Sequence, residues 1–203
     1  AICASAPTYY GNVSLLDLGA NISCDANNFH QFGVLASMKC NLIDGIENPS
    51  IKLLNVGEES NKGTKELKAA AKLFNEDKNL NYQGFIEGNN LFNDPVDVIV
   101  CDGFTGNVAL KTAEGVARLA TGIGADIVKQ RFSLRLLSKI FTKSLDDFKN
   151  RLSPTQHNGA IFLGLNRIVV KSHGSAQKYA FENAIYKANL YAEKNIINLL
   201  QPK

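Results

Sequence analysis

The sequence lacks the cysteine patterns that mark metal and redox sites. Its four cysteines, Cys3, Cys24, Cys40 and Cys101, include no Cys-x-x-Cys pair and no cluster with histidine. We therefore expect neither a metal site nor a redox dithiol, and a reducing cytoplasm is the simplest location. Cys101 ends an apolar run and precedes Asp102, so it could act as a nucleophile, but the favoured interpretation is a small buried residue.

Long apolar runs are missing as well. No stretch approaches the roughly 18 apolar residues that a membrane-spanning helix needs. The first residues, 1–7, are small but contain no basic segment followed by an apolar one, so we expect no signal peptide. The chain does not begin with methionine, and we expect it to be a fragment.

Two nucleotide-binding signatures are also absent. Residues 57–64 resemble a phosphate loop, but a Walker loop places its lysine after the second glycine, and here Lys62 precedes Gly63. The Gly-x-Gly at 122–124 follows a predicted helix and has Ile127 where the third glycine of a dinucleotide fingerprint should stand. ATP and NAD are therefore disfavoured.

What is present fits a soluble globular protein. The chain has 203 residues, of which 45% are hydrophobic and 20% charged, and this composition excludes a disordered or collagen-like chain. A chain of this length forms one large domain, or a domain with an appendage, and buries about 70% of its unfolded surface.

The chain repeats one pattern: an apolar run, a glycine-containing turn and an amphipathic helix. This alternation predicts an α/β fold with a mainly parallel sheet. Strands are predicted at 15–18, 51–56, 85–86, 96–101 and 167–171, and helices at 29–38, 67–74, 108–112 and from 176 onward. In the last helix alanine recurs every fourth residue from Ala176 to Ala192, which predicts a narrow face for core or subunit packing.

The most informative stretch is 96–112, where the apolar run breaks at Gly103 and Gly106 and a helix follows. The first amides of a helix lack intrahelical partners, and glycines expose bare backbone, so this geometry predicts an anion site. Asn107 stands at its mouth. Its carboxamide could cap the helix or donate to a developing oxyanion, and the motif alone favours the cap.

Polar side chains follow four of the apolar runs: Asn21, Lys62, Asn107 and His173. In open parallel sheets ligands bind at the carboxyl ends of the strands. If the strands are neighbours, these four side chains converge on one crevice. Lys62 could hold a phosphate or be a solvated surface lysine, and the sequence leaves both interpretations open.

Residues 129–151 hold seven Lys/Arg against two Asp, a local charge of +5 in a chain of net charge +3. Basic and apolar side chains fall on different faces of a helix there, which predicts an element that lies on an anionic membrane surface. A helix packed on its own domain or on a second copy is the alternative. Nucleic acid is a weaker option, because no binding module accompanies the charge. The membrane or carrier contacts are predicted to be Arg131, Phe132, Arg135, Leu136, Lys139, Ile140 and Lys143.

Four segments together carry a resemblance to a known family. They read LLDLGAN at 15–21, LLNVGEE followed by KG within 53–63, VIVCDGFTGNVALKTAEG at 98–115, and VVKSHGSA at 169–176. On these motifs the chain resembles the phosphate acyltransferase (PlsX) family of bacterial phospholipid synthesis. The resemblance implies an enzyme that forms acyl phosphate from acyl-[acyl carrier protein] and inorganic phosphate, without a cofactor.

The same resemblance implies a three-layer α/β/α fold, like those of phosphotransacetylases and isocitrate/isopropylmalate-type dehydrogenases, with a basic amphipathic protrusion. It also implies a homodimer, and a cytoplasmic enzyme that docks peripherally on a membrane. The N-terminal portion of the family is missing, so the chain corresponds to a C-terminal part. Asn158, Gly159 and Ala160 stand where many members carry Gly-Gly-Ala.

By this resemblance Lys62 and Asn107 match active-site positions, and we add His173 to the catalytic set. Phosphate attack on a thioester needs an anion cradle and oxyanion donors but little base catalysis, because phosphate, with a second pKa of about 6, is largely dianionic at neutral pH. We assign Lys62 to phosphate, Asn107 and the amides after Gly106 to the thioester oxygen or the phosphate, and His173 to binding or protonation. The substrate-binding positions are Asn21, Gly63, Asp102, Gly103, Thr105 and Gly106, of which Asp102 could serve only its own turn.

We expect three segments: an incomplete α/β core at 1–126, the basic helical excursion at 127–153, and a return strand with a long helix at 154–203. Two other classes of function stay open. One is a phosphotransacetylase-like or dehydrogenase-like enzyme on the same fold. The other is an inactive truncated module that dimerises or binds membrane.

Overall fold

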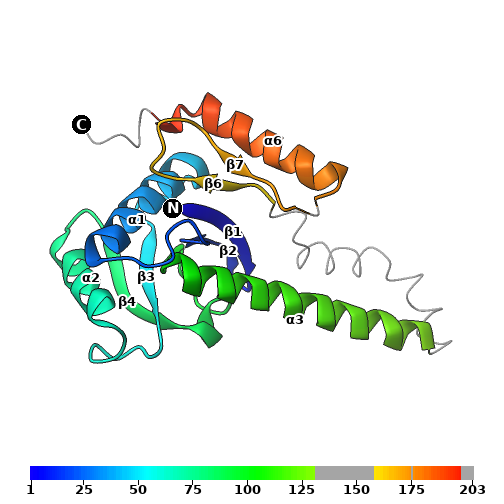
Figure 1. The fold of residues 1–203 in the computed structure, drawn as a ribbon, viewed down its shortest axis with the longest axis horizontal. Helices are drawn as coiled ribbons and strands as arrows, with labels where there is room; N and C mark the ends of the chain where they lie inside the picture. Colours follow the sequence, from blue (N-terminus) through cyan, green and yellow to red (C-terminus); the bar gives the residue numbers. More distant parts are fainter. Residues whose placement is uncertain (131–157, 175, 198–203) are drawn as a thin grey trace.

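The computed structural model describes residues 1–130, 158–174 and 176–197 (Figure 1). A seven-stranded sheet with the order β4-β3-β5-β2-β1-β6-β7 forms its centre. The strands are β1 (Ile2–Thr8), β2 (Gly11–Leu16), β3 (Ser50–Asn55), β4 (Asn81–Glu87), β5 (Val98–Val100), β6 (Ala160–Phe162) and β7 (Val170–Lys171). The helices are α1 (Ala26–Lys39), α2 (Lys65–Glu76), α3 (Gly103–Gln130) and α6 (Lys178–Glu193), with short turns at Cys40–Asp44 and Gly88–Asn90.

The sheet has two parts. Strands β4, β3, β5 and β2 pair in parallel, whereas β1 pairs antiparallel with β2 and with β6, and β6 pairs antiparallel with β7. The α/β fold predicted from the alternating pattern is confirmed, with a mixed sheet. Its parallel part carries the strand ends where the sequence predicts a ligand site.

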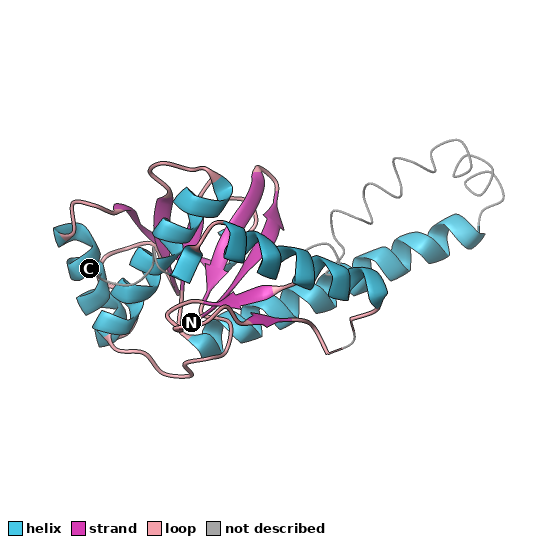
Figure 2. Cartoon of the chain, turned by 90° about the horizontal axis from the view of Figure 1, so that it is seen from above, coloured by secondary structure: helices cyan, strands magenta, loops and turns pink. Residues whose placement is uncertain are grey.

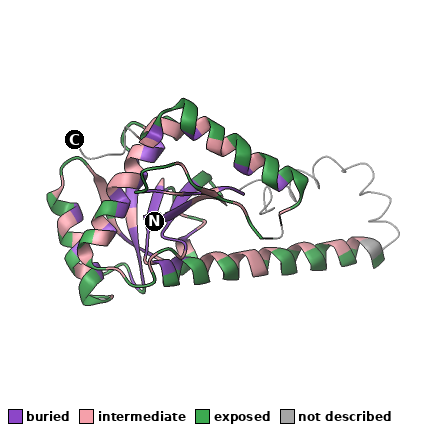
Figure 3. Cartoon of the chain, turned by 45° about the horizontal axis from the view of Figure 1, so that its top comes forward, coloured by how far each residue is buried: buried purple, intermediate pink, exposed green. Residues whose placement is uncertain are grey.

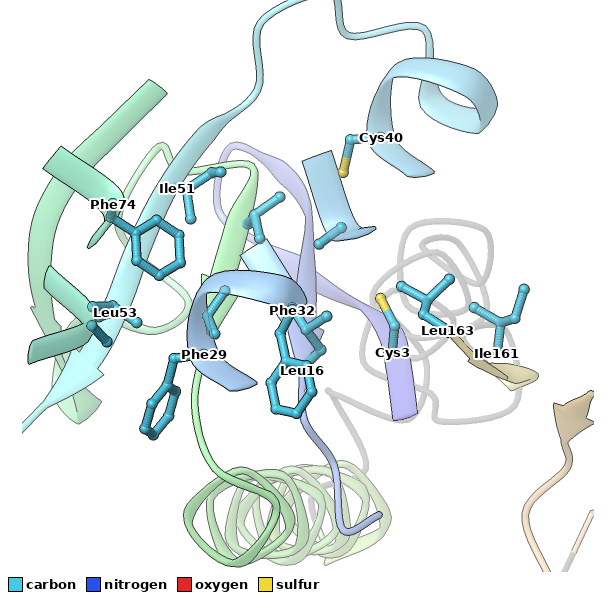
Figure 4. Close-up of a cluster of buried hydrophobic side chains, with 14 of the residues drawn as sticks. Cys3, Leu16, Phe29, Phe32, Cys40, Ile51, Leu53, Phe74, Ile161 and Leu163 are labelled. Carbon is cyan, nitrogen blue, oxygen red and sulfur yellow. The ribbon is translucent and has the colours of Figure 1, made fainter. Parts of the chain in front are cut away.

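Successive side chains on the strands point to opposite faces, and each face has its own core. Leu16, Leu53 and Val100 face α1 and α2, and Phe29, Phe32 and Phe74 from these helices cover them (Figure 4). Their neighbours Leu15, Leu54 and Ile99 face the other side, where Ala109 and Leu110 of α3 pack. The buried residues line the sheet between these helices, while most of α3 carries partly buried or exposed residues (Figure 3).

Two strands were absent from the sequence prediction. β1 contains Pro7 and small residues without alternation, and it forms because a tight turn at Tyr9 and Tyr10 lets it pair with β2 from Thr8↔Gly11 to Ala4↔Leu15. β6 is only three residues long and pairs with β1 through Ile2↔Phe162. Both depend on pairing partners that a local pattern does not reveal.

Two predictions about helices need correction. The Gly-x-Gly at 122–124 lies inside α3 and does not follow a helix, because α3 continues to Gln130 and projects beyond the sheet (Figure 2). On α6, Ala180 and Ala184 are buried and Ala188 is half-buried, as predicted for a packing face, but Ala192 is exposed, so within this chain the alanine face does not pack at the last turn of the helix. The three-segment division stays a prediction, since most of its middle segment lies outside the described residues.

Candidate functional site

The strands β2, β5 and β3 are parallel neighbours, and they end together. Val100 pairs with Leu16 of β2 and with Leu53 of β3, so the segments that follow these strands leave the same edge of the sheet. They carry Asn21, Asn107 and the Lys62 loop, which we define as residues 56–63. The hypothesis that these strands are neighbours is therefore confirmed for three of the four predicted side chains.

A buried carboxylate organises the segment after β2. Asp17 is fully buried, and its two oxygens accept hydrogen bonds from the backbone N–H groups of Ile2, Ala20 and Asn21 and from Asn21 Nδ2, at 2.6–3.1 Å. Burial by itself raises the pKa of Asp17, but the hydrogen bonds from Ile2, Asn21 and Ala20 outweigh it and lower this pKa. The sequence does not single out Asp17 as a site residue, because nothing in a local pattern marks an aspartate as buried.

The start of α3 differs from the prediction. The helix begins at Gly103, and Asp102 caps it, since Asp102 accepts hydrogen bonds from the Thr105 backbone N–H at 2.8 Å and from its hydroxyl at 2.7 Å. Asn107 lies in the second turn and is not the cap. The proposed oxyanion amides after Gly106 are inside the helix, where they serve intrahelical bonds, and the Gly103 and Gly106 amides donate to Asn21 and Asp102 oxygens.

Close packing at this helix start requires glycine. A Cβ on Gly106 would collide with the Asp17 carbonyl oxygen and lie 2.6 Å from Cys101 Sγ, and one on Gly103 would lie 2.6 Å from the Asn21 carbonyl oxygen. The two glycines thus let α3 press its first turn against residues 17–21. This contact fixes Asn107 beside Gly19. The Asn107 carboxamide is exposed and forms no hydrogen bond within the described ranges.

The Lys62 loop is exposed and glycine-rich. The Lys62 N–H donates to the Glu59 carbonyl at 3.0 Å, and Asn90 Nδ2 donates to Glu58 at 3.2 Å. The stem of the Lys62 side chain lies over Gly57, and Gly63 has a φ of +83°. The loop leads directly into Thr64, whose hydroxyl accepts the Leu67 N–H and caps α2.

His173 lies elsewhere. It follows β7, which runs opposite to β2, so its strand end lies at the other edge of the sheet. Its Nε2 is 3.2 Å from Lys111 Nζ and 3.8 Å from a carboxylate oxygen of Glu114, both on α3. The structure therefore brings His173 to α3 and not to the Lys62 loop, which corrects the expected convergence of all four side chains.

Asn158 holds the backbone of His173 in place, and Glu114 lies near its ring. Asn158 is buried, accepts the His173 N–H at 2.8 Å, and donates to the Ala180 carbonyl at 2.6 Å. Glu114 has a side chain only 12% exposed and pairs with Lys111 at 2.9 Å. Neither residue was predicted as part of the site.

A cavity of about 1240 Å³ lies between β1, α3 and residues 158–173. Its walls are mainly apolar, from β1 and from Leu91, Phe92 and Leu110. Asn107 borders this cavity, as do Lys111 and His173. An apolar space bordered by an amide, a cation and an imidazole suits a ligand with a long apolar part and a polar head.

The interpretation of Cys101 as a buried residue is confirmed. Its side chain is 1% exposed, and burial together with the charges of Asp102 and Asp17 raises the pKa of its thiol well above the ordinary value. A thiolate nucleophile is therefore disfavoured.

Within 1–130, 158–174 and 176–197, no group of three metal-ligating side chains comes together, and none of the helices has the length and apolarity to cross a bilayer. The predicted membrane or carrier contacts, Arg131, Phe132, Arg135, Leu136, Lys139, Ile140 and Lys143, lie outside the described residues.

Comparisons with known proteins agree with the motifs. A phosphate acyltransferase from Colwellia psychrerythraea is 46% identical over 97% of this chain and 57% of its own length. The phosphate acyltransferase from Alcanivorax borkumensis is 42% identical over 98% of the chain, and the one from Halorhodospira halophila is 42% identical over 100% of it. Each match covers 59% of the relative's own length. The chain thus spans somewhat more than half of these relatives. Among solved structures, EutD phosphotransacetylase from Staphylococcus aureus matches 57% of this chain and 41% of its own, at 15% identity and a TM-score of 0.43. The model of the family described as fatty acid synthesis protein matches residues 1–199, and the chain belongs to that family, as its resemblance to the phosphate acyltransferases predicted.

Proposed function

We propose that this chain contributes to the active site of a phosphate acyltransferase that forms acyl phosphate from acyl-[acyl carrier protein] and inorganic phosphate. The observation that carries the proposal is the shared edge of β2, β5 and β3, which sets the Lys62 loop and Asn107 on neighbouring strand ends. The names and identities of the curated relatives support the same reaction.

In this proposal Lys62 binds the attacking phosphate, and the Asn107 carboxamide donates to the thioester oxygen as negative charge develops on it. A phosphate oxygen attacks the thioester carbonyl, the tetrahedral intermediate expels the carrier thiolate, and a proton restores the thiol. Asp17 positions Asn21 and the start of α3, and therefore sets the place of Asn107. His173 serves binding or protonation together with Lys111, at the cavity that Asn107 also borders.

The test is acyl-phosphate formation by the full-length protein. Lys62→Ala and Asn107→Ala should each lower the rate by about two to three orders of magnitude, which is the typical effect of losing one oxyanion donor. Thr121→Ser, at a half-buried position on α3 away from the strand ends, is the matched control. Wild-type rates in both variants would refute the assignment.

The proposal extends to partners. Val116, Leu119, Ile123 and Ile127 form an exposed apolar row on α3, 49–63% exposed, at helical spacing. Such a row supports a homodimer that covers it with a second copy, since monomers rarely leave a contiguous apolar surface in water. Acyl carrier proteins are acidic, so the basic residues of 129–151 serve the carrier or an anionic membrane surface of a cytoplasmic enzyme.

A vesicle experiment separates these two roles. An Arg135→Glu/Lys139→Glu variant should lose co-sedimentation with anionic vesicles if the segment meets lipid, and the binding of the unmodified protein should fall as salt rises. Unchanged binding by the variant would refute the membrane role and leave the carrier as the proposed contact.

A further inference from the structure

Two buried side-chain atoms have no hydrogen-bond partner among the residues that the structure describes, and one of them lies beneath the Lys62 loop. They are Asn55 Nδ2 and the Tyr82 hydroxyl. Tyr82 packs beside the ring of Phe74, with centroids 5.1 Å apart, in the core under α2. Asn55 is 7% exposed and is the last residue of β3, directly before the loop. Unpaired buried amides are rare, because such a group loses its hydrogen bonds to water and gains none.

The orientation of the Asn55 carboxamide is fixed by its neighbour. Its Oδ1 accepts the Val56 backbone N–H at 2.9 Å. If the carboxamide were turned over, two N–H donors would face each other. The group without a partner is therefore the Nδ2 donor, and what it lacks is an acceptor oxygen.

Asn55 lies against the point where the loop enters α2. A Cβ added to Gly63 would collide with Asn55 Oδ1 and lie 3.0 Å from Asn55 Nδ2, so only a glycine fits over the carboxamide. Gly63 is flanked by Lys62 and by Thr64, the cap of α2. The unpaired donor and a helix N-terminus thus meet at one glycine, and Lys62 is the residue directly before it.

The N-terminus of α2 already attracts negative charge. Glu66 is the acidic residue of its first turn, and hydrogen bonds from its own backbone N–H and from the Thr64 hydroxyl lower the pKa of its carboxyl group. Glu66 is exposed, so this carboxylate can leave for solvent when another anion arrives. The helix start therefore favours an oxyanion, and Glu66 is its competitor within the chain.

We propose that the Asn55 side chain is a binding residue for an oxyanion of the phosphate class, held between Lys62 and the N-terminus of α2. Gly63 shifts to admit the anion, Asn55 Nδ2 donates to one of its oxygens, and Oδ1 keeps its bond to Val56. This binding role rests on the proposed function of the Lys62 loop, and it adds a buried, uncharged donor to the site. A buried donor on a strand end has a fixed position, so it defines the position of the anion better than a flexible lysine does.

Equilibrium dialysis of the full-length protein with labelled inorganic phosphate tests the proposal. Asn55→Ala should weaken phosphate binding at least tenfold, whereas Glu66→Gln should strengthen it severalfold because the competing charge is gone. Asn75→Ala, at an exposed position near the other end of α2, is the matched control and should bind like the unmodified protein. Thermal unfolding in phosphate-free buffer checks that each variant folds.

Should Asn55→Ala unfold, Asn55→Asp gives the same test, since it keeps the acceptor for Val56 and replaces the unpaired donor with an oxygen. Phosphate affinity within twofold of the unmodified protein in either folded variant overturns the proposal, as does an unmodified protein that binds no phosphate. Acyl-phosphate formation is measured separately. A protein that binds phosphate through Asn55 but forms no acyl phosphate would contradict the proposed function alone, and the reverse result would contradict this inference alone.

Discussion

The Asp17 carboxylate holds Asn21 at two points: Oδ2 accepts the Asn21 backbone N–H at 2.6 Å and its side-chain Nδ2 at 2.8 Å. Asn21 in turn accepts the Gly103 N–H through its carbonyl at 2.7 Å. A buried charge after β2 therefore sets the position of the first residue of α3. The place of Asn107, one turn further on, depends on this chain of contacts.

Asp17→Asn should destabilise the protein strongly. The amide removes the negative charge and puts a donor where Ile2, Ala20 and Asn21 already donate, so buried N–H groups lose their acceptor. We expect a loss of about 3 kcal/mol in the free energy of unfolding, the usual result of breaking a buried charged network. For a chain of this size that lowers the midpoint of thermal unfolding by about 6–12 °C. Asp25→Asn is the control, because asparagine caps α1 as well as aspartate does.

The stabilising effect of Asp17 should disappear in acid. Its folded pKa lies below the unfolded value of about 3.9, so the ionised group stabilises the fold above that pH. This contribution is lost as the pH falls through the folded pKa, in the window below about pH 4. Chemical denaturation at pH 2–7 measures it: the difference between the unmodified protein and Asp17→Asn should narrow below pH 4. A difference that stays constant down to pH 2 would show that Asp17 does not act through its charge.

The start of α3 was predicted only in part from the sequence. The apolar run, the two glycines and the following helix are evident in the sequence, but the pattern predicts that the helix begins near Asn107. Gly103 and Gly106 have poor helix propensity, and they are helical because their missing side chains let α3 contact Asn21 and Asp17. Tertiary contact overrides local propensity here, and no local pattern reports it.

The same limit applies at β1 and at Asp17. The motif LLDLGAN predicted a strand and a turn, but it does not show that Asp17 is buried against the backbone of Ile2, a residue 15 positions away in the sequence. Likewise the position of His173 depends on two short strands, β6, which pairs with β1, and β7, which pairs with β6. Local periodicity predicted the four parallel strands at least in part, because each contains an apolar run, and in the antiparallel half it predicted β7 but missed β1 and β6.

Two single substitutions distinguish the proposed catalytic role of Asn107 from the structural role of Asp102. Asp102 caps α3, so Asp102→Ala should cost about 1 kcal/mol in unfolding free energy. Asn107→Ala removes an exposed carboxamide within the helix and should change stability by no more than about 0.5 kcal/mol. In the acyl-phosphate assay, Asn107→Ala should nevertheless lose most of the activity. Strong destabilisation by Asn107→Ala would instead assign this residue to the fold.

Two glycines on α3 give a matched pair. A Cβ at Gly106 has no room beside Asp17 and Cys101, so Gly106→Ala should cost about 1–3 kcal/mol or more. A Cβ at Gly115 meets nothing within 4 Å, and Gly115→Ala should stabilise the helix by about 0.5–1 kcal/mol. Urea denaturation of both variants measures the change in the free energy of unfolding, which should be a loss for Gly106→Ala and a gain for Gly115→Ala. Equal effects would mean that α3 does not pack its first turn against residues 17–21.

The exposed apolar row on α3 predicts how the oligomeric state responds to charge. Leu119 and Ile123 are 63% and 52% exposed and lie one turn apart, so glutamates at both positions place two charges at the centre of the proposed interface. Burying these charges without partners is costly, and Leu119→Glu/Ile123→Glu should shift the full-length protein from dimer to monomer in sedimentation velocity. Asn75→Glu adds a charge to an exposed position of α2 and should leave the dimer intact. A dimer that persists in the double variant would place the contact between copies on another face.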